Sequence, residues 1–320
     1  MTWYLVKRLV MTVIVVLAVM TFLSVLVHLV PGDPVQIVLG PQASPSQIAF
    51  VRHEMRLDQP VPVQVWDFVT SALHGNLGQD FLSHQPVAQI IWQALPETLV
   101  LALTALGLAA LAGVPLGVLA ARRAGSLADR VLGVVSVSFI TIPSYVAGMG
   151  LLLLFAVTLR VLPAVGTGSL SDPADYARHL VMPATALALA WIGYIARLVR
   201  TSMLTVLDSG FIRTARAFGL PSRVIFYKWA LKNAIIPTVA VLSTGLADMF
   251  GGAVLVEVIF TRPGLGLTIV QAITERNFPI VQGGALVIAV FYVLVNLIAD
   301  LSYRFLDPRI RVEESALGAI

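Results

Sequence analysis

Six long apolar segments alternate with more polar stretches along this chain. They cover approximately Leu9–Val30, Thr98–Ala121, Val131–Leu159, Leu180–Val199, Ala234–Ile259 and Gly284–Leu306. About 20 apolar residues are enough for a helix to cross a hydrocarbon core of roughly 30 Å. The pattern therefore predicts an all-α, polytopic membrane protein with six transmembrane helices. The third segment is long and contains Pro143, so we expect a kink or a tilt there.

The composition agrees with a membrane protein. Charged residues make up 12 % of the chain and hydrophobic residues 58 %, whereas soluble proteins have roughly 25 % charged residues. The absence of cysteine excludes disulfides, thiolate metal sites and cysteine nucleophiles. Lys7 and Arg8 precede the first apolar run as they would in a signal peptide. That run is longer than a typical signal core and no small-residue cleavage site follows it, so we expect a retained first helix.

The basic residues are distributed unevenly between the two sides of the predicted membrane. Six spans place both termini on one side, and 15 of the 21 Lys and Arg residues fall on that side. Because cytoplasmic loops carry an excess of Lys and Arg, both termini are predicted to lie in the cytoplasm. This topological bias accounts for the net charge of +4 without a nucleic-acid partner.

The predicted spans also divide the chain into regions. Residues 1–30 form an N-terminal transmembrane helix, 31–96 an external cap, 97–306 a transmembrane core with a cytoplasmic elbow at 200–232, and 307–320 a cytoplasmic tail. Within the cap, Pro45–Met55 and Val63–Leu73 have the pattern of short amphipathic helices. In the core, Gly113 and Gly117 make a small-residue face that suits close helix packing.

Familiar catalytic motifs are absent. The chain has no Gly-x-x-x-x-Gly-Lys-Ser/Thr phosphate loop, no His-Glu-x-x-His zinc motif and no Gly-x-Ser-x-Gly elbow. We therefore expect no enzymatic site, no metal site and no cofactor bound by this chain itself.

The most informative polar stretch is the basic loop that follows the fourth apolar segment. From Arg197 to Lys232 it carries seven basic residues and one acid, Asp208. Asp208 and Ser209 are good N-caps for a short helix over Phe211–Phe218. A strongly basic and ordered cytoplasmic elbow is expected to dock another protein.

The end of that helix has its own signals. Gly219 suits the left-handed position that terminates helices, Pro221 blocks continuation, and Ser222 caps a second helix running from Arg223 towards Asn233. Ala215 and Gly219 are four residues apart and would form a notch that a partner could approach closely.

The alternative interpretation of the elbow is an ordinary interfacial helix. In that case Phe211, Ile212 and Phe218 would lie among lipid headgroups and the arginines on phosphates. The local pattern leaves both interpretations open.

Arg213 to Leu220, with the sequence Arg-Thr-Ala-Arg-Ala-Phe-Gly-Leu, resembles the ATPase-docking loop of ABC importer permeases in its dipeptide, oligopeptide and nickel branch. The general Glu-Ala-Ala pattern of that loop is matched at Ala215, Gly219 and Leu231. It is not matched at four positions, namely Arg213, Thr214, Trp229 and Lys232.

Three further stretches resemble the B-type permease of the same branch. They are Gly32-Asp33-Pro34, the run from Val256 to Gly266, and Asp307-Pro308-Arg309. The resemblance thus covers nearly the whole chain. Asn277, where aspartate is common, and Asn76 are departures from the pattern.

The resemblance implies a type I ABC importer permease fold in a bacterial or archaeal inner membrane, and ATP-driven import of dipeptides, oligopeptides or related small solutes by alternating access. The implied partners are a homologous C-type permease, two ATPase subunits that bind ATP and Mg, an extracytoplasmic solute-binding protein and the lipid bilayer. The residues implied in ATPase coupling are Arg213, Thr214, Ala215, Arg216, Gly219, Leu220, Pro221 and Ser222.

Three charged residues are candidates for the translocation pathway or a gate. Asp248 falls near the middle of the fifth span, where a charge is costly and usually faces a bundle interior. It either lines a cavity that meets a peptide's amino terminus, or is a structural acid bonded to Ser243, Thr244 or a neighbouring helix. Glu257 and Arg262, near the outer end of that span, either contribute to an outer gate or form an interfacial ion pair.

Two other functional classes remain open. An ion-coupled secondary transporter or channel would need intramembrane coupling groups, of which only Asp248 is central. A purely structural membrane scaffold would need neither a docking elbow nor a polar cavity.

Overall fold

The structure, a computed structural model, describes residues 10–11, 13–22, 25, 43–54, 58–80 and 83–306. Within this part every regular element is a helix, with one isolated bridge between Gln79 and Pro86. The Gly32–Pro34 and Asp307–Arg309 motifs, the tail and much of the first predicted span lie outside the described residues. The chain forms two compact units, residues 1–98 with 263–293, and residues 99–262 with 294–320.

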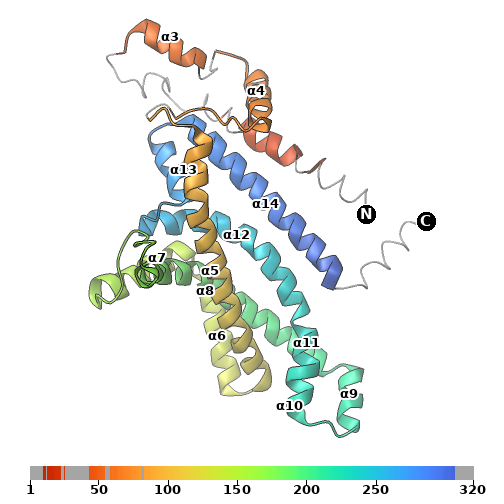
Figure 1. Cartoon of the computed structure of the whole chain (residues 1–320). Coiled ribbons are helices and arrows are strands. Elements are labelled where there is room, and N and C mark those ends of the chain that lie inside the picture. Colours follow the sequence, from red (N-terminus) through yellow and green to blue (C-terminus); the bar gives the residue numbers. More distant parts are fainter. Residues whose placement is uncertain are drawn as a thin grey trace, which may run out of the picture. The chain divides into compact units, whose positions relative to one another are not determined.

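The first unit contains the predicted cap helices (Figure 1). Its elements are a short apolar helix at Val13–Phe22, α3 (Pro45–Glu54), α4 (Val61–Leu73), the start of α5 (Val87–Arg122), α13 (Leu265–Thr274) and most of α14 (Phe278–Leu306). The two short helices predicted in the cap are therefore confirmed. The second apolar segment begins earlier than predicted, at Val87, whose N–H donates to the carbonyl of Gly78 at 3.0 Å.

A buried polar contact joins distant parts of the first unit. The side-chain amide of Asn277, in the α13–α14 turn, donates to the carboxylate of Asp80, and both residues are buried. The same carboxylate accepts the backbone N–H of Ser83 at 3.0 Å. An ionised aspartate at position 277 would offer no donor and would place two carboxylates side by side. The asparagine, a departure from the resembled pattern, is thus the residue that suits Asp80.

The second unit is built around one long helix, α8 (Pro173–Leu207). It packs against α6 (Leu127–Thr141), α7 (Ser144–Leu151) and α12 (Ile236–Phe260). The other elements of this unit are the rest of α5, the π-helix η1 (Leu152–Thr158), α9 (Gly210–Ala217), α10 (Ser222–Val224), the π-helix η2 (Ile225–Ala230), α11 (Leu231–Ala234) and the end of α14.

Small residues let the helices of this unit approach closely. A Cβ added at Gly113 of α5 would lie 2.8 Å from Ile195 Cβ, and one at Gly117 would lie 2.5 Å from the carbonyl oxygen of Ala196. The predicted small-residue face is therefore confirmed, and α8 is what it packs against. On α8 itself, a Cβ at Gly193 would collide with the backbone of α6.

The third apolar segment differs from the prediction. We expected a kinked or tilted span, but α6 and the following α7–η1 segment meet at an angle of 102°. Pro143 lacks an N–H, and it forces the preceding residue out of the helical region. Ile142 accordingly has extended backbone angles, φ −77° and ψ 117°. The segment is a broken span or a re-entrant loop rather than one straight helix.

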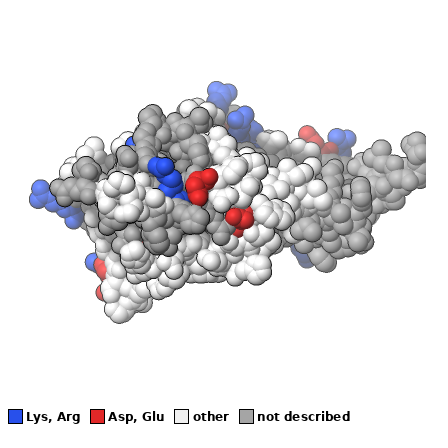
Figure 2. All heavy atoms as spheres, turned by 90° about the horizontal axis from the view of Figure 1, so that it is seen from above, with Lys and Arg blue, Asp and Glu red and all other residues white. Residues whose placement is uncertain are grey.

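In the part of the chain that the structure describes, four helices are long and apolar enough to cross a membrane, and the bent pair adds a fifth. These helices and Val13–Phe22 lie on all six predicted apolar segments. Among the described residues on the face drawn in Figure 2, Lys, Arg, Asp and Glu side chains form small spots and most of the other residues are uncharged.

Candidate functional site

The long helix α8 connects two loops that bear on function. Its 35 residues extend over about 52 Å, well beyond the roughly 30 Å hydrocarbon core. The loop containing Leu170 precedes its first turn, and the elbow follows its last turn at Leu207. A membrane around α8 therefore separates the Leu170 loop from the elbow.

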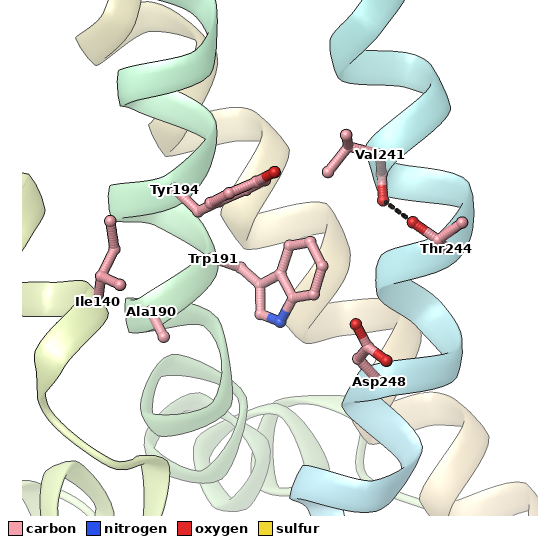
Figure 3. Close-up of a pocket in the computed structure, with 7 residues that line it drawn as sticks. All are labelled: Ile140, Ala190, Trp191, Tyr194, Val241, Thr244 and Asp248. Carbon is pink, nitrogen blue, oxygen red and sulfur yellow. Dashed lines mark hydrogen bonds between the residues drawn. The ribbon is translucent and has the colours of Figure 1, made fainter.

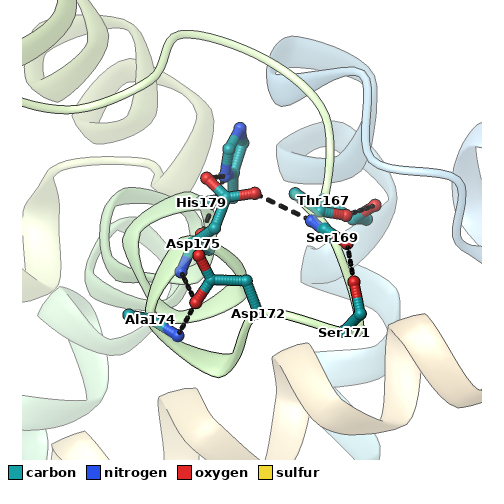
Figure 4. A network of polar contacts seen from close by, with 8 residues as sticks. Thr167, Ser169, Ser171, Asp172, Ala174, Asp175 and His179 are labelled. Carbon is teal, nitrogen blue, oxygen red and sulfur yellow. Dashed lines mark hydrogen bonds and ion pairs between the residues drawn. The ribbon is translucent and has the colours of Figure 1, made fainter.

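The first turn of α8 is held by a network of polar contacts (Figure 4). Asp172 is the N-cap, and its carboxylate accepts the N–H groups of Ala174 and Asp175 at 3.0 and 3.3 Å. The carboxylate of Asp175 accepts the N–H of Ser169 at 2.8 Å and lies 3.4 Å from Nδ1 of His179. The network fixes the preceding loop on the helix end, and it gives His179 a structural role.

At the other end of α8, the elbow contains the predicted helix–turn–helix. α9 ends in a Schellman motif, in which the Gly219 N–H donates to the Arg216 carbonyl at 2.9 Å and the Leu220 N–H to the Ala215 carbonyl at 3.3 Å. Gly219 has φ +72°, and no atom lies within 4 Å of the position a Cβ would take. A glycine is therefore favoured at this position by the left-handed backbone angle, and not because a side chain would collide with a neighbour.

The predicted caps of the elbow need correction. Asp208 is the C-cap of α8. Ser209 occupies the N-cap position of α9 as predicted, but its hydroxyl donates back to the Val206 carbonyl at 2.5 Å instead of accepting an N–H of α9. Pro221 occupies the N-cap position of α10, and Ser222 is its first helical residue. The Ser209 hydroxyl is bonded to the preceding turn, and Ser and Thr side chains commonly form such local bonds in place of a helix cap.

The faces of α9 also differ from the predicted notch. Ile212 is fully buried and Ala215 is only 5 % exposed, because α9 packs against η2. Ala215 therefore faces its own chain and not an open notch, and Ile212 is not available to lipid headgroups. The outward side carries Phe211 and Phe218, the latter 82 % exposed. The other coupling candidates, Arg213, Thr214, Arg216, Gly219, Leu220, Pro221 and Ser222, are all exposed.

A second feature lies between three helices of the second unit. A hollow of about 370 Å³ is lined by residues from α6, α8 and α12, namely Ile140, Ala190, Trp191, Tyr194, Val241, Thr244 and Asp248 (Figure 3). The Trp191 and Tyr194 rings meet edge to face with centroids 5.8 Å apart. The sequence pattern missed this pair, although aromatic residues in the middle of a span, away from the interfacial belts, are a usable signal.

The surroundings of Asp248 bear on its two interpretations. Its carboxylate lines the hollow, and among the described residues it makes no hydrogen bond or ion pair. The Ser243 hydroxyl donates to the Val239 carbonyl and the Thr244 hydroxyl to the Val241 carbonyl, each at 3.0 Å. Neither hydroxyl is bonded to Asp248, so the hydrogen bonds expected of a structural acid with Ser243 or Thr244 are not formed.

The other two pathway candidates are buried. Glu257 and Arg262 both have no exposed surface, and the backbone N–H of Arg262 donates to the backbone carbonyl of Glu257 at 2.9 Å. The Arg262 guanidinium donates to the Tyr176 hydroxyl at 2.6 Å and lies over its ring, 5.2 Å from the centroid. Between them Thr261 has φ +48°, which is strained for a β-branched residue. This junction is therefore a tightly packed, buried corner of the second unit.

In the described part of the chain, no group of three or more His, Asp or Glu side chains is placed to hold a metal ion. What these sites offer is an exposed basic elbow and a hollow, between helices long enough to cross a membrane, that is lined by one carboxylate.

Residues 113–312 match the family described as the inner membrane component of binding-protein-dependent transport systems, and residues 1–102 match its N-terminal region. The chain belongs to this family. It is therefore a permease subunit of an ABC importer.

Curated relatives match over nearly their whole length. "Probable peptide ABC transporter permease protein y4tP" of Sinorhizobium fredii is 39 % identical over 96 % of this chain and 99 % of its own. "Probable D,D-dipeptide transport system permease protein DdpB" of Escherichia coli is 38 % identical, over 93 % and 94 %. "Glutathione transport system permease protein GsiC" of Salmonella typhi is 35 % identical, over 96 % and 98 %.

Solved structures confirm the fold. A chain of the MetNI methionine ABC transporter in an inward-facing conformation superposes with a TM-score of 0.57 at 19 % identity, covering 68 % of this chain and 97 % of that one. A chain of an amino acid ABC transporter gives a TM-score of 0.54, also at 19 % identity, covering 68 % and 94 %. The predicted type I permease fold is thereby confirmed.

Proposed function

We propose that this subunit carries dipeptides, oligopeptides or closely related solutes into the cytoplasm. In this proposal it pairs with a second, homologous permease, docks two ATPase subunits through the elbow and receives solute from an external binding protein. ATP and Mg²⁺ are bound by the ATPase subunits. The names of the relatives, which refer to peptides, D,D-dipeptides and glutathione, support this substrate class.

The observation that carries the coupling role is the outward side of α9 and its terminal turn. Burial of Ile212 and Ala215 fixes α9 on its own chain, and this leaves Phe218 and Arg213 pointing away from it. An apolar side chain flanked by arginines suits a protein surface with a hydrophobic pocket and an acidic rim.

The connections of the elbow to its neighbouring helices support a role in transmitting movement. It follows α8 directly and leads through α11 into α12, and these two long helices also line the hollow. Movement imposed on α9 by ATPase closure would therefore reach the helices around the hollow. Such docking does work only if its free energy differs between the inward-facing and outward-facing states.

We further propose that the elbow and both termini are cytoplasmic. The excess of Lys and Arg at the elbow end of α8 supports this orientation. Residues 31–96 and the Leu170 loop would then face outward, towards the binding protein.

Site-specific crosslinking tests both the partners and the orientation. The chain has no cysteine, so a single cysteine can be introduced without background. Phe218→Cys and Leu170→Cys are matched positions, 82 % and 78 % exposed, beyond opposite ends of α8. In the assembled importer, we expect position 218 to crosslink to an ATPase subunit and position 170 to the binding protein. The reverse result, or crosslinks from 218 to lipid alone, would refute the proposal.

A further inference from the structure

We propose that the hollow between α6, α8 and α12 is a subsite for a primary ammonium group of the solute in transit. The Asp248 carboxylate is its counter-ion, and the Trp191 and Tyr194 rings form its aromatic wall (Figure 3). This inference rests on the proposed peptide import and adds to it a binding site inside the membrane.

The first step is the position of the charge. Asp248 is at the midpoint of α12, with 12 residues on either side, so it is about 18 Å along the helix from each end. A carboxylate at this depth is costly, and such residues usually pair or face a polar path. Asp248 is exposed, lines the hollow, and has no hydrogen-bonding or ionic partner among the described residues. The free acceptor is therefore available to a group that enters the hollow.

The second step is the wall beside the carboxylate. The rings of Trp191 and Tyr194, one helical turn apart on α8, both border the hollow. Aromatic faces attract cations, and the attraction strengthens when water is excluded. One carboxylate with two aromatic side chains therefore favours a cation over an anion or a neutral group.

The third step is how the tryptophan is held. A Cβ at Gly245 of α12 would lie 2.7 Å from both Cζ3 and Cη2 of Trp191. The indole ring therefore packs directly on the α12 backbone, one turn before Asp248. The absence of a side chain at position 245 is what seats the ring beside the carboxylate.

The fourth step is the chemistry of the ligand. A primary ammonium has three N–H donors and no acceptor, which matches a carboxylate whose oxygens are unoccupied. The volume of about 370 Å³ lies within the range of small-molecule sites. In a peptide this group is either the free amino terminus or a lysine side chain.

A binding experiment on the complete importer without its binding protein separates these sources. The probes are dialanine, N-acetyl-dialanine and N-acetyl-alanyl-lysine, measured by equilibrium dialysis. We expect dialanine to bind at least tenfold more tightly than its acetylated form, a difference of about 1.4 kcal/mol. If the lysine probe equals dialanine, the subsite accepts any primary ammonium. If the lysine probe binds as weakly as N-acetyl-dialanine, the subsite is specific for the free amino terminus of the peptide.

Three variants make the test specific. Asp248→Asn is expected to abolish the tenfold preference and Asp248→Glu to keep it. Ser243→Ala is the matched control on the same helix but outside the lining of the hollow, because its hydroxyl is already bonded to the Val239 carbonyl, and it should bind like wild type. Equal amounts in the membrane and equal thermal unfolding temperatures establish that the variants are folded.

Uptake of dialanine into proteoliposomes, with the binding protein and ATP, distinguishes failure of the subsite from failure of the proposed function. If the wild-type importer takes up dialanine but shows no preference, or Asp248→Asn retains it, the subsite is refuted and peptide import stands. If wild type transports none of the peptides, both fail. If uptake runs on a proton gradient without ATP and stops in Asp248→Asn for every probe, Asp248 is an ion-coupling group instead.

Discussion

Replacement of Gly219 tests whether the turn between α9 and α10 couples ATP hydrolysis to transport. Gly219 has φ +72°, and the space where a Cβ would stand is empty. Any effect of a small side chain must therefore come from the backbone and not from a collision. For most L-residues the left-handed region costs roughly 1–2 kcal/mol, whereas asparagine tolerates it.

This magnitude separates local from global effects. A domain with a stability of about 5–15 kcal/mol stays folded after losing 1–2 kcal/mol, so membrane insertion should be normal. The same energy lowers the ratio of intact to frayed turn by roughly 5–30-fold. The turn supplies the N–H groups that bond the Ala215 and Arg216 carbonyls, so its loss frays the end of α9 next to Phe218.

The assay is solute uptake per ATP hydrolysed in proteoliposomes, with subunit amounts held equal. We expect Gly219→Val to lower the uptake per ATP hydrolysed by up to roughly 30-fold, and Gly219→Asn to stay within about twofold of wild type. Gly219→Asp should also uncouple transport, because it adds a negative charge to a basic docking surface. Equal ratios in the valine and asparagine variants, or normal uptake in the aspartate variant, would refute the role of this turn.

Two further predictions concern packing within the second unit. Gly245→Ala should lower stability by about 1–3 kcal/mol, because the new Cβ would stand 2.7 Å from the ring of Trp191. Gly251→Ala, on the same helix, has open space around its Cβ and should be neutral or mildly stabilising. Thermal unfolding in detergent compares the two variants. Asp129 binds Arg200 through two contacts of 2.5 and 2.7 Å, between α6 and α8. Asp129→Ala should lower stability by only about 1 kcal/mol, because the Arg200 side chain is 34 % exposed. Arg200→Lys should also be destabilising, because lysine cannot make the two-point contact with the carboxylate. Unchanged unfolding temperatures in both variants would contradict this.

The sequence alone determined the features that depend on local pattern. Apolar runs are visible wherever a helix must match the thickness of a bilayer, so all six segments carried their own signal. The elbow was equally local, because a glycine at a left-handed position and a proline two residues later end a helix whatever surrounds them. The backbone angle of Gly219 confirms that part of the prediction.

Tertiary structure decided which side chains meet. The bend before Pro143 was expected only as a kink, because its angle of 102° depends on how α6 and α7 pack on α8. Ala215 was predicted to face a partner, and packing against η2 buried it. The hollow joins Asp248 to aromatic side chains more than 50 residues away in the sequence, on another helix. Periodicity states which residues share a helix face, but only the contact between helices fixes what that face meets.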